Sequence, residues 1–309
     1  SFLKLVVFLW IAVNVFILFV PITGNDAIDY HLPIMFDVLK HGYLTFDKSI
    51  EKFNYLPVAA EILYAVPMAM FNEKTAPFVF QILQYSALAL FLMLAYEFLN
   101  KRVENKFLVW SALLAVLSIT DFLREIMHGG YIDVFVYLFG LASMLLALDY
   151  ISENKTDAKG LILPAMLLGV ALSMKYIALV FLFFTGLFLV IHFWKQKIGL
   201  TKAFKLFLAY YAIILLVAGF WYAKNLTNFW NPVSPMFSYS EDSFKGALKA
   251  ALFKNTLTNF LIFPLMLFGL RFVSAKETAS RLIVFGNYIS FYVIAFLAMV
   301  FKKLWRKLS

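Results

Sequence analysis

Residues 176–194 read YIALVFLFFTGLFLVIHFW, a run that contains no Asp, Glu, Lys or Arg. A helix needs about 20 mainly apolar residues to cross the hydrocarbon core of a bilayer. The rest of the chain has the same character: of its 309 residues, 63% are hydrophobic and 15% are charged, and the mean hydropathy is +0.84. A soluble domain does not need this much apolar surface to fill its core. The sequence therefore predicts an all-α integral membrane protein with many transmembrane helices.

Similar apolar runs recur from one end of the chain to the other, and we predict about nine transmembrane helices from them. The predicted spans are residues 5–21, 77–98, 107–120, 134–148, 161–174, 176–194, 206–222, 257–270 and 282–301. We treat residues 1–309 as a single transmembrane module.

The net charge of +9 comes from Lys and Arg residues that cluster in links between the spans. Such clusters favour the cytoplasmic side and do not indicate nucleic acid as a partner. The basic links are 100–106, 195–205 and 271–281, so we expect the N-terminus inside and segments 22–76 and 224–256 outside. Nine spans would put the basic residues at 302–307 outside, so either the count is wrong by one or the native chain continues past Ser309.

The first outer segment, residues 22–76, contains two stretches with apolar residues at helical spacing, 28–41 and 58–71. Both are too short to span a bilayer. We predict two amphipathic juxtamembrane helices at the membrane surface.

Ionisable residues gather at the outer edges of the predicted spans, where charge is costly and usually lines a cavity or a pathway. They are Asp26, Asp29, His31, Asp121, Arg124, Glu125, His128, Asp133 and Lys175. The set predicts one outward-facing polar cavity, although any single member also fits an ordinary headgroup-level charge. Lys175 interrupts an apolar stretch, so we expect it at a helix end next to an anion; a lysine that snorkels from a tight hairpin is the alternative.

Several classes of site are excluded. The chain has no cysteine, which removes disulfides, thiolate metal sites and cysteine catalysis. It also lacks a Walker loop, a dinucleotide-binding glycine motif, an H-E-x-x-H zinc motif and a G-x-S-x-G elbow.

Short motifs follow one another along the predicted outer side. They are NDAIDYHLP at 25–33, YLP at 55–57, AEILY at 60–64, GYID at 130–133, KY at 175–176, KN at 224–225 and NPVSP at 231–235. In this order the chain resembles the C-type (GT-C) membrane glycosyltransferases, which include protein O-mannosyltransferases and lipid A aminoarabinose transferases. The family continues into C-terminal elements that we expect to be absent from this chain.

The resemblance implies an inverting transferase that moves a sugar from a polyprenyl-phosphate-linked donor to a hydroxyl on a lipid, glycan or protein. It implies that Asp26 is the catalytic carboxylate, which would take the proton of the hydroxyl. Asp29 lies one helical turn further on and is the second choice of base. The alternative for Asp26 is a helix N-cap.

The resemblance also assigns binding roles. Lys175 leads as the cation for the donor phosphate, with Arg124 and His128 behind it. Asp133 would orient the acceptor, pair with a cation, or hold a divalent metal (Mg²⁺ or Mn²⁺) with Asp26, and we leave the metal undecided. His31, Tyr30 and Glu61 would contact the acceptor or support the loop.

We expect the protein in a prokaryotic plasma membrane, surrounded by membrane lipids, with the active site on the outer face. A membrane transporter or lipid scramblase that uses the same polar cavity is the alternative function.

Overall fold

The computed structural model describes residues 2–16, 22, 27–42, 56–71, 76–117 and 131–233. These residues form helices joined by turns and contain no strand, which confirms the all-α prediction for this part of the chain. By its internal contacts the chain divides into two compact units, Ser1–Leu114 with Arg124–Phe237, and Ala115–Leu123 with Ser238–Ser309. All described residues except 115–117 belong to the first unit.

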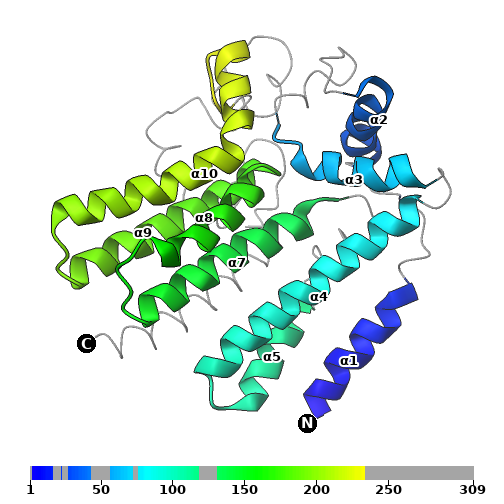
Figure 1. The fold of residues 1–309 in the computed structure, drawn as a ribbon. Helices are drawn as coiled ribbons and strands as arrows, with labels where there is room; N and C mark the ends of the chain where they lie inside the picture. Colours follow the sequence, from blue (N-terminus) through cyan, green and yellow to red (C-terminus); the bar gives the residue numbers. More distant parts are fainter. Residues whose placement is uncertain are drawn as a thin grey trace, which may run out of the picture. The chain divides into compact units, whose positions relative to one another are not determined.

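Figure 1 shows the described helices, labelled in chain order. They are α1 (Phe2–Asn14), the π-helical turn η2 (Ala27–His31), α2 (Leu32–His41), α3 (Ala59–Met70), α4 (Ala76–Arg102), α5 (Lys106–Leu117), α7 (Asp133–Ser152), α8 (Lys159–Leu172), the 3-10 turn η4 (Tyr176–Ala178), α9 (Leu179–Lys195) and α10 (Leu200–Phe229).

Four stretches of the described chain are long and apolar enough to cross a membrane: Phe78–Arg102, Asp133–Ser152, Tyr176–Lys195 and Leu200–Asn228. Three shorter apolar helices accompany them, over Phe2–Val13, Ala59–Met70 and Lys159–Leu172. The protein is therefore an integral membrane protein. The count of nine spans stays a prediction, since residues 257–270 and 282–301 lie outside the described residues.

Helix α10 is longer than the predicted span 206–222. It begins after Gly199 and ends at Phe229. The next residue, Trp230, caps the helix in left-handed backbone, and its N–H donates to the carbonyl of Leu226 at 3.0 Å. The prediction was short because hydropathy marks only the apolar part of a helix, whereas backbone hydrogen bonding continues through lysines at either end. At the N-terminus, α1 ends at Asn14 and residues 17–21 of the predicted first span lie outside the described residues.

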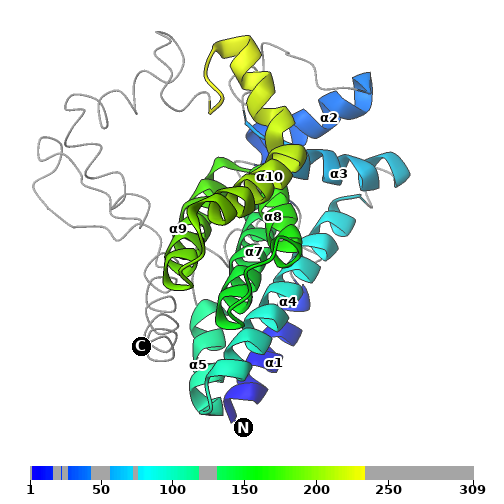
Figure 2. The same cartoon turned by 60° about the vertical axis from the view of Figure 1, so that its left-hand side comes forward.

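Helix α7 lies at the centre of the bundle, in contact with α4, α8 and α9, while α10 packs on α8 (Figures 1 and 2). Within their apolar windows, 67% of α7 is buried but only 22% of α10.

Two close approaches between helices need glycine. A Cβ on Gly140 would lie 2.4 Å from the ring of Phe181 on α9, and a Cβ on Gly169 would lie 2.7 Å from Val217 on α10. Small residues at such crossings are typical of membrane helix pairs.

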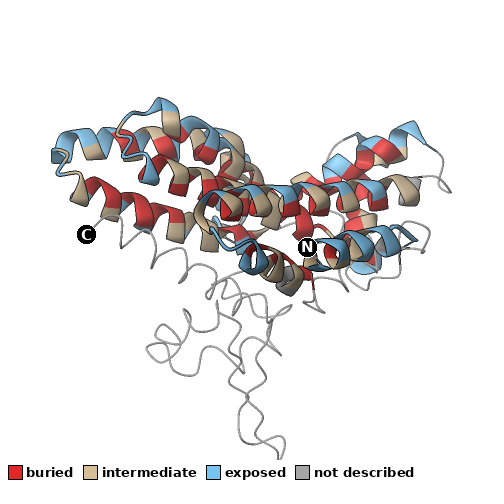
Figure 3. Ribbon diagram, turned by 90° about the horizontal axis from the view of Figure 1, so that it is seen from below, coloured by how far each residue is buried: buried red, intermediate tan, exposed pale blue. Residues whose placement is uncertain are grey.

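Many large apolar side chains are exposed. Figure 3 colours the ribbon by burial and shows the exposed positions on the sides of the helices that face away from their neighbours. On α10, Leu216 is 85% exposed, and Leu215 and Phe220 are exposed beside it. An apolar face of this extent is unfavourable in water. It fits contact with lipid chains.

The two helices predicted in the first outer segment are present as η2–α2 and α3, which pack on each other near one end of α4 (Figures 1 and 2). Pro33 lies in the first turn of α2, and Gly42 ends the helix in the left-handed conformation at φ 75°. Ile34 and Met35 are buried, whereas Ile28 and Phe36 are exposed. Their position at the membrane surface stays a prediction.

Candidate functional site

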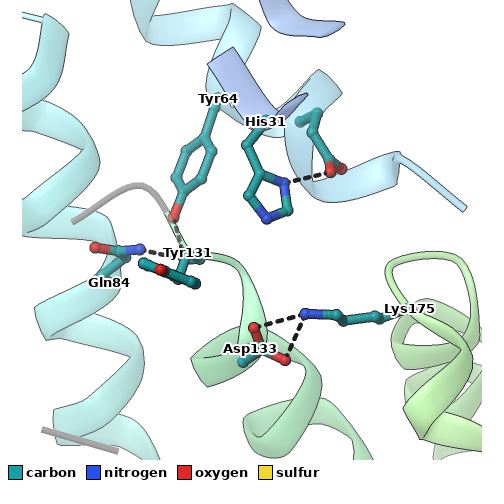
Figure 4. Close-up of polar contacts among 7 residues, drawn as sticks. His31, Tyr64, Gln84, Tyr131, Asp133 and Lys175 are labelled. Atoms are coloured by element: carbon teal, nitrogen blue, oxygen red, sulfur yellow. Dashed lines mark hydrogen bonds and ion pairs between the residues drawn. The ribbon is translucent and has the colours of Figure 1, made fainter. Parts of the chain in front are cut away.

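A group of polar side chains lies where the η2–α2 and α3 segments meet α4, the start of α7 and the α8–η4 junction (Figure 4). We call the group the polar cluster. Its members are His31, Glu61, Tyr64, Gln84, Tyr131, Asp133 and Lys175.

Backbone and apolar contacts hold these segments together. The N–H of Ala59, at the start of α3, donates to the carbonyl of Ser173 after α8 at 3.1 Å. Tyr30, Ile34, Val58 and Trp221 form one buried apolar group that joins η2–α2 to α10. The polar cluster is therefore built from elements far apart in the sequence that pack as one unit.

Lys175 and Asp133 form an ion pair in the polar cluster. The Nζ of Lys175 donates to both carboxylate oxygens of Asp133, each at 2.8 Å. Lys175 lies in extended backbone between α8 and η4, and Asp133 is the first residue of α7, where the helix dipole favours an acid. This confirms that Lys175 sits at a helix end beside an anion. A role in binding donor phosphate stays a prediction.

His31 and Glu61 form the second pair. The Nδ1 of His31 lies 2.7 Å from Oε1 of Glu61, and the two residues are 2% and 1% exposed. A carboxylate accepts hydrogen bonds, so in the neutral imidazole the hydrogen lies on Nδ1 and Nε2 keeps its lone pair. Among the described residues, neither Nε2 of His31 nor Oε2 of Glu61 has a hydrogen-bond partner.

Tyr64 and Gln84 fix the residue that precedes α7 by two positions. The Tyr64 hydroxyl donates to the carbonyl of Tyr131 at 3.2 Å, and the amide of Gln84 donates to the same oxygen. Burial raises the pKa of Tyr64 well above its usual value; contact with Gln84 opposes the rise, and the charges of Glu61 and Asp133 add to it. Tyr64 therefore stays a hydrogen-bond donor over the physiological range.

The His31–Glu61 pair and the Lys175–Asp133 pair lie near each other, with Tyr131 to one side (Figure 4). The rings of His31 and Tyr131 are 6.4 Å apart, edge to face. Figure 4 shows the His31 ring directed toward the side on which Tyr131, Asp133 and Lys175 lie. A buried imidazole and a fixed ion pair are thus brought into one neighbourhood, and this arrangement has the groups that move a proton and offset an anionic charge.

The other predicted site residues are placed differently. Asp29 is exposed on η2, and Tyr30 is buried in the apolar group, with its ring centroid 4.0 Å from that of His31. Asp26, Arg124 and His128 lie outside the described residues, as do Asp121 and Glu125.

Sequence reasoning missed Gln84 and the pairing of Glu61 with His31. Gln81 and Gln84 are two amides inside the predicted span 77–98, and polar groups within a span are a sign of function that would have drawn attention to them. The partner of Glu61 lies 30 positions away on another helix, and no sequence spacing indicates it.

No group of three or more acidic or histidine side chains in the described part of the chain is arranged to hold a metal ion. The predicted pair of Asp26 and Asp133 includes a residue outside that part. Whether the protein binds a divalent metal therefore stays undecided, as it was from the sequence.

Comparison with known proteins adds no assignment: no family model, curated protein or solved structure matches this chain.

Proposed function

We propose that this protein is an inverting glycosyltransferase of the GT-C type, which moves a sugar from a polyprenyl phosphate carrier to a hydroxyl at the outer membrane face. One observation carries the proposal. His31, Glu61, Asp133 and Lys175 come from four separate sequence segments that resemble this family, and they lie together in the polar cluster. We expect about nine transmembrane helices in the GT-C arrangement around it.

The donor end of the reaction needs positive charge. When the bond between sugar and phosphate breaks, negative charge develops on the phosphate oxygens, and a fixed cation stabilises it. Lys175 donates two hydrogen bonds to Asp133, so its position is set before the donor arrives. A donor phosphate competes with Asp133 for this cation. When the donor binds, either Lys175 therefore exchanges Asp133 for the phosphate, or Arg124 and His128 supply further positive charge.

The acceptor end needs a base. A hydroxyl is a poor nucleophile until a base removes its proton in the transition state. The sequence favours Asp26 for this role, followed by Asp29. Both precede His31 within one short segment, so the base belongs to the part of the chain that carries η2.

Turnover of lipid-linked sugars tests the proposal. The purified protein in lipid nanodiscs is incubated with a panel of polyprenyl phosphate sugars, with and without EDTA, and free polyprenyl phosphate is measured. We expect release by the wild type with at least one donor and transfer with inversion at the anomeric carbon. If Asp26 is the base, as the sequence favours, Asp26→Asn loses both. The EDTA arm decides whether a divalent cation takes part.

Failure on every donor would contradict the transferase. In that case the same preparation, assayed for movement of labelled lipids or sugars across vesicles, tests the transporter or scramblase alternative.

A further inference from the structure

The geometry points to His31 as the group that receives the proton of the acceptor hydroxyl, with Glu61 as the residue that positions it. The assignment rests on the proposed function and replaces Asp26 in the role of base. It comes from the placement of side chains, which the sequence motifs do not contain.

The imidazole of His31 is held in one orientation. Glu61 Oε1 lies 2.7 Å from Nδ1, and this bond fixes both the tautomer and the ring plane. The ring also packs against Tyr30 at 4.0 Å between centroids and faces Tyr131 at 6.4 Å. The lone pair of Nε2 is consequently held in one direction, toward the side of Tyr131 and Asp133 (Figure 4).

The buried His31–Glu61 pair carries a cost in free energy. Burying an ionisable pair removes its hydration, and a buried polar atom without a partner adds a further penalty. Here Nε2 of His31 and Oε2 of Glu61 are both buried and lack a partner among the described residues. A hydroxyl that donates to Nε2 would remove the penalty for the unpartnered Nε2.

A purely structural role explains less. If the contact only joined η2 to α3, two apolar side chains of similar volume could replace it. Such an apolar pair is often as stable as a buried ion pair. The segment already has such contacts in Tyr30, Ile34 and Val58. A histidine and a glutamate add chemistry that packing does not require.

The transfer step moves one proton, forms one bond and breaks one bond. The O–H proton of the acceptor moves to Nε2 of His31, and the acceptor oxygen forms a bond to the anomeric carbon from the face opposite the phosphate. The bond between that carbon and the phosphate oxygen breaks, and its electron pair leaves with polyprenyl phosphate. The imidazolium that forms is paired with the Glu61 carboxylate, as in other acid–base pairs of this kind, and then releases its proton to water.

Two substitutions separate catalysis from folding. His31→Asn places an amide N–H near the position of Nδ1, so the bond to Glu61 can persist while Nε2 is removed. We expect transfer to fall about 10²- to 10⁴-fold, with the KM for donor within a few fold and an unchanged Tm. Glu61→Gln should lower kcat about 10-fold or more, because the imidazolium loses its counter-charge. His41→Asn, in the more exposed His41–Asp37 pair of α2, is the matched control and should transfer like wild type.

Chemical rescue gives an independent readout if His31→Asn folds poorly. We expect added imidazole to restore part of the transfer activity of His31→Gly and to leave Asp26→Asn unchanged. Wild-type transfer by His31→Asn, or no rescue in a His31→Gly protein that still binds donor, overturns the assignment and returns the base to Asp26. If the wild type releases no polyprenyl phosphate from any donor, the proposed function itself is wrong. That outcome differs from the two results that overturn only the role of His31.

Discussion

The ammonium of Lys175 lies 2.8 Å from each carboxylate oxygen of Asp133, and this contact joins the α8–η4 junction to the first residue of α7 across 42 positions of sequence. The side chain of Asp133 is 9% exposed and that of Lys175 is 27% exposed. The pair is therefore shielded from water more than an ordinary surface ion pair, and removing one partner leaves a poorly hydrated charge.

Neutralising only Asp133 or only Lys175 should destabilise the protein more than neutralising both. We expect Asp133→Asn and Lys175→Gln each to lower the Tm in detergent, and the double variant to recover part of the loss, with a coupling of about 1 kcal/mol or more. The exposed pair of Glu97 and Lys101 is the control, and Glu97→Gln should have almost no effect. Strict additivity at Asp133 and Lys175 would contradict the account.

Alkaline pH should destabilise the protein in part through Tyr64. Its folded pKa lies above the unfolded value because the phenol is buried, so the folded state holds the proton more tightly. The contribution is fully present below about pH 10 and is lost as the pH rises above that value. The Tm of wild type should therefore fall more steeply than that of Tyr64→Phe between about pH 9 and about pH 11.

At neutral pH, Tyr64→Phe should cost only about 1 kcal/mol, because Gln84 still donates to the carbonyl of Tyr131. Parallel pH curves for the two proteins would show that Tyr64 is not buried as described.

The helix crossing at Gly169 should not accept a side chain. A Cβ there would lie 2.7 Å from Cβ of Val217 and 3.3 Å from the carbonyl oxygen of Ile214, so α8 and α10 would have to separate. We expect Gly169→Ala to cost about 1–3 kcal/mol, measured as a lower Tm. Gly219→Ala is the control on α10: its nearest neighbour would be Leu215 Cβ at 3.8 Å, and it should be neutral or slightly stabilising. Equal losses in the two variants would count against the crossing.

The sidedness of the membrane helices is open to direct measurement because the chain has no cysteine. Asn154→Cys, in the exposed turn between α7 and α8, should react with a membrane-impermeant maleimide only from the cytoplasmic side. Asp29→Cys should react only from the outside. Leu216→Cys, on the exposed apolar face of α10, should resist the reagent until detergent is added. Labelling of residues 29 and 154 from the same side would overturn the predicted topology.

Much of the fold could be predicted from apolar periodicity. The runs 134–148 and 176–194 correspond closely to α7 and to η4–α9, and the helices at 28–41 and 58–71 are present. Hydropathy failed where a helix continues past its apolar part, as α10 does through Lys202 and Lys224. Hydropathy reports which residues avoid water. It does not report where a helix ends, because the end is set by a capping residue such as Trp230.

The candidate site was predicted less completely. An anionic partner for Lys175 could be expected because the lysine interrupts an apolar stretch, and the sequence placed Asp133 on the same predicted side of the membrane. It gave no reason to pair His31 with Glu61, because that contact depends on how η2 crosses α3. A pattern along one helix carries no information about the angle at which two helices meet.

The rate at which a Lys175 variant releases polyprenyl phosphate decides whether Lys175 stabilises the leaving phosphate of a transferase. In nanodiscs with an accepted donor, wild type should release polyprenyl phosphate, and Lys175→Ala should do so about 100-fold more slowly because the developing phosphate charge loses its cation. Lys159→Ala, an exposed lysine at the other end of α8, should match wild type. Release by Lys175→Ala at the wild-type rate, or no release by wild type from any donor, would contradict the account.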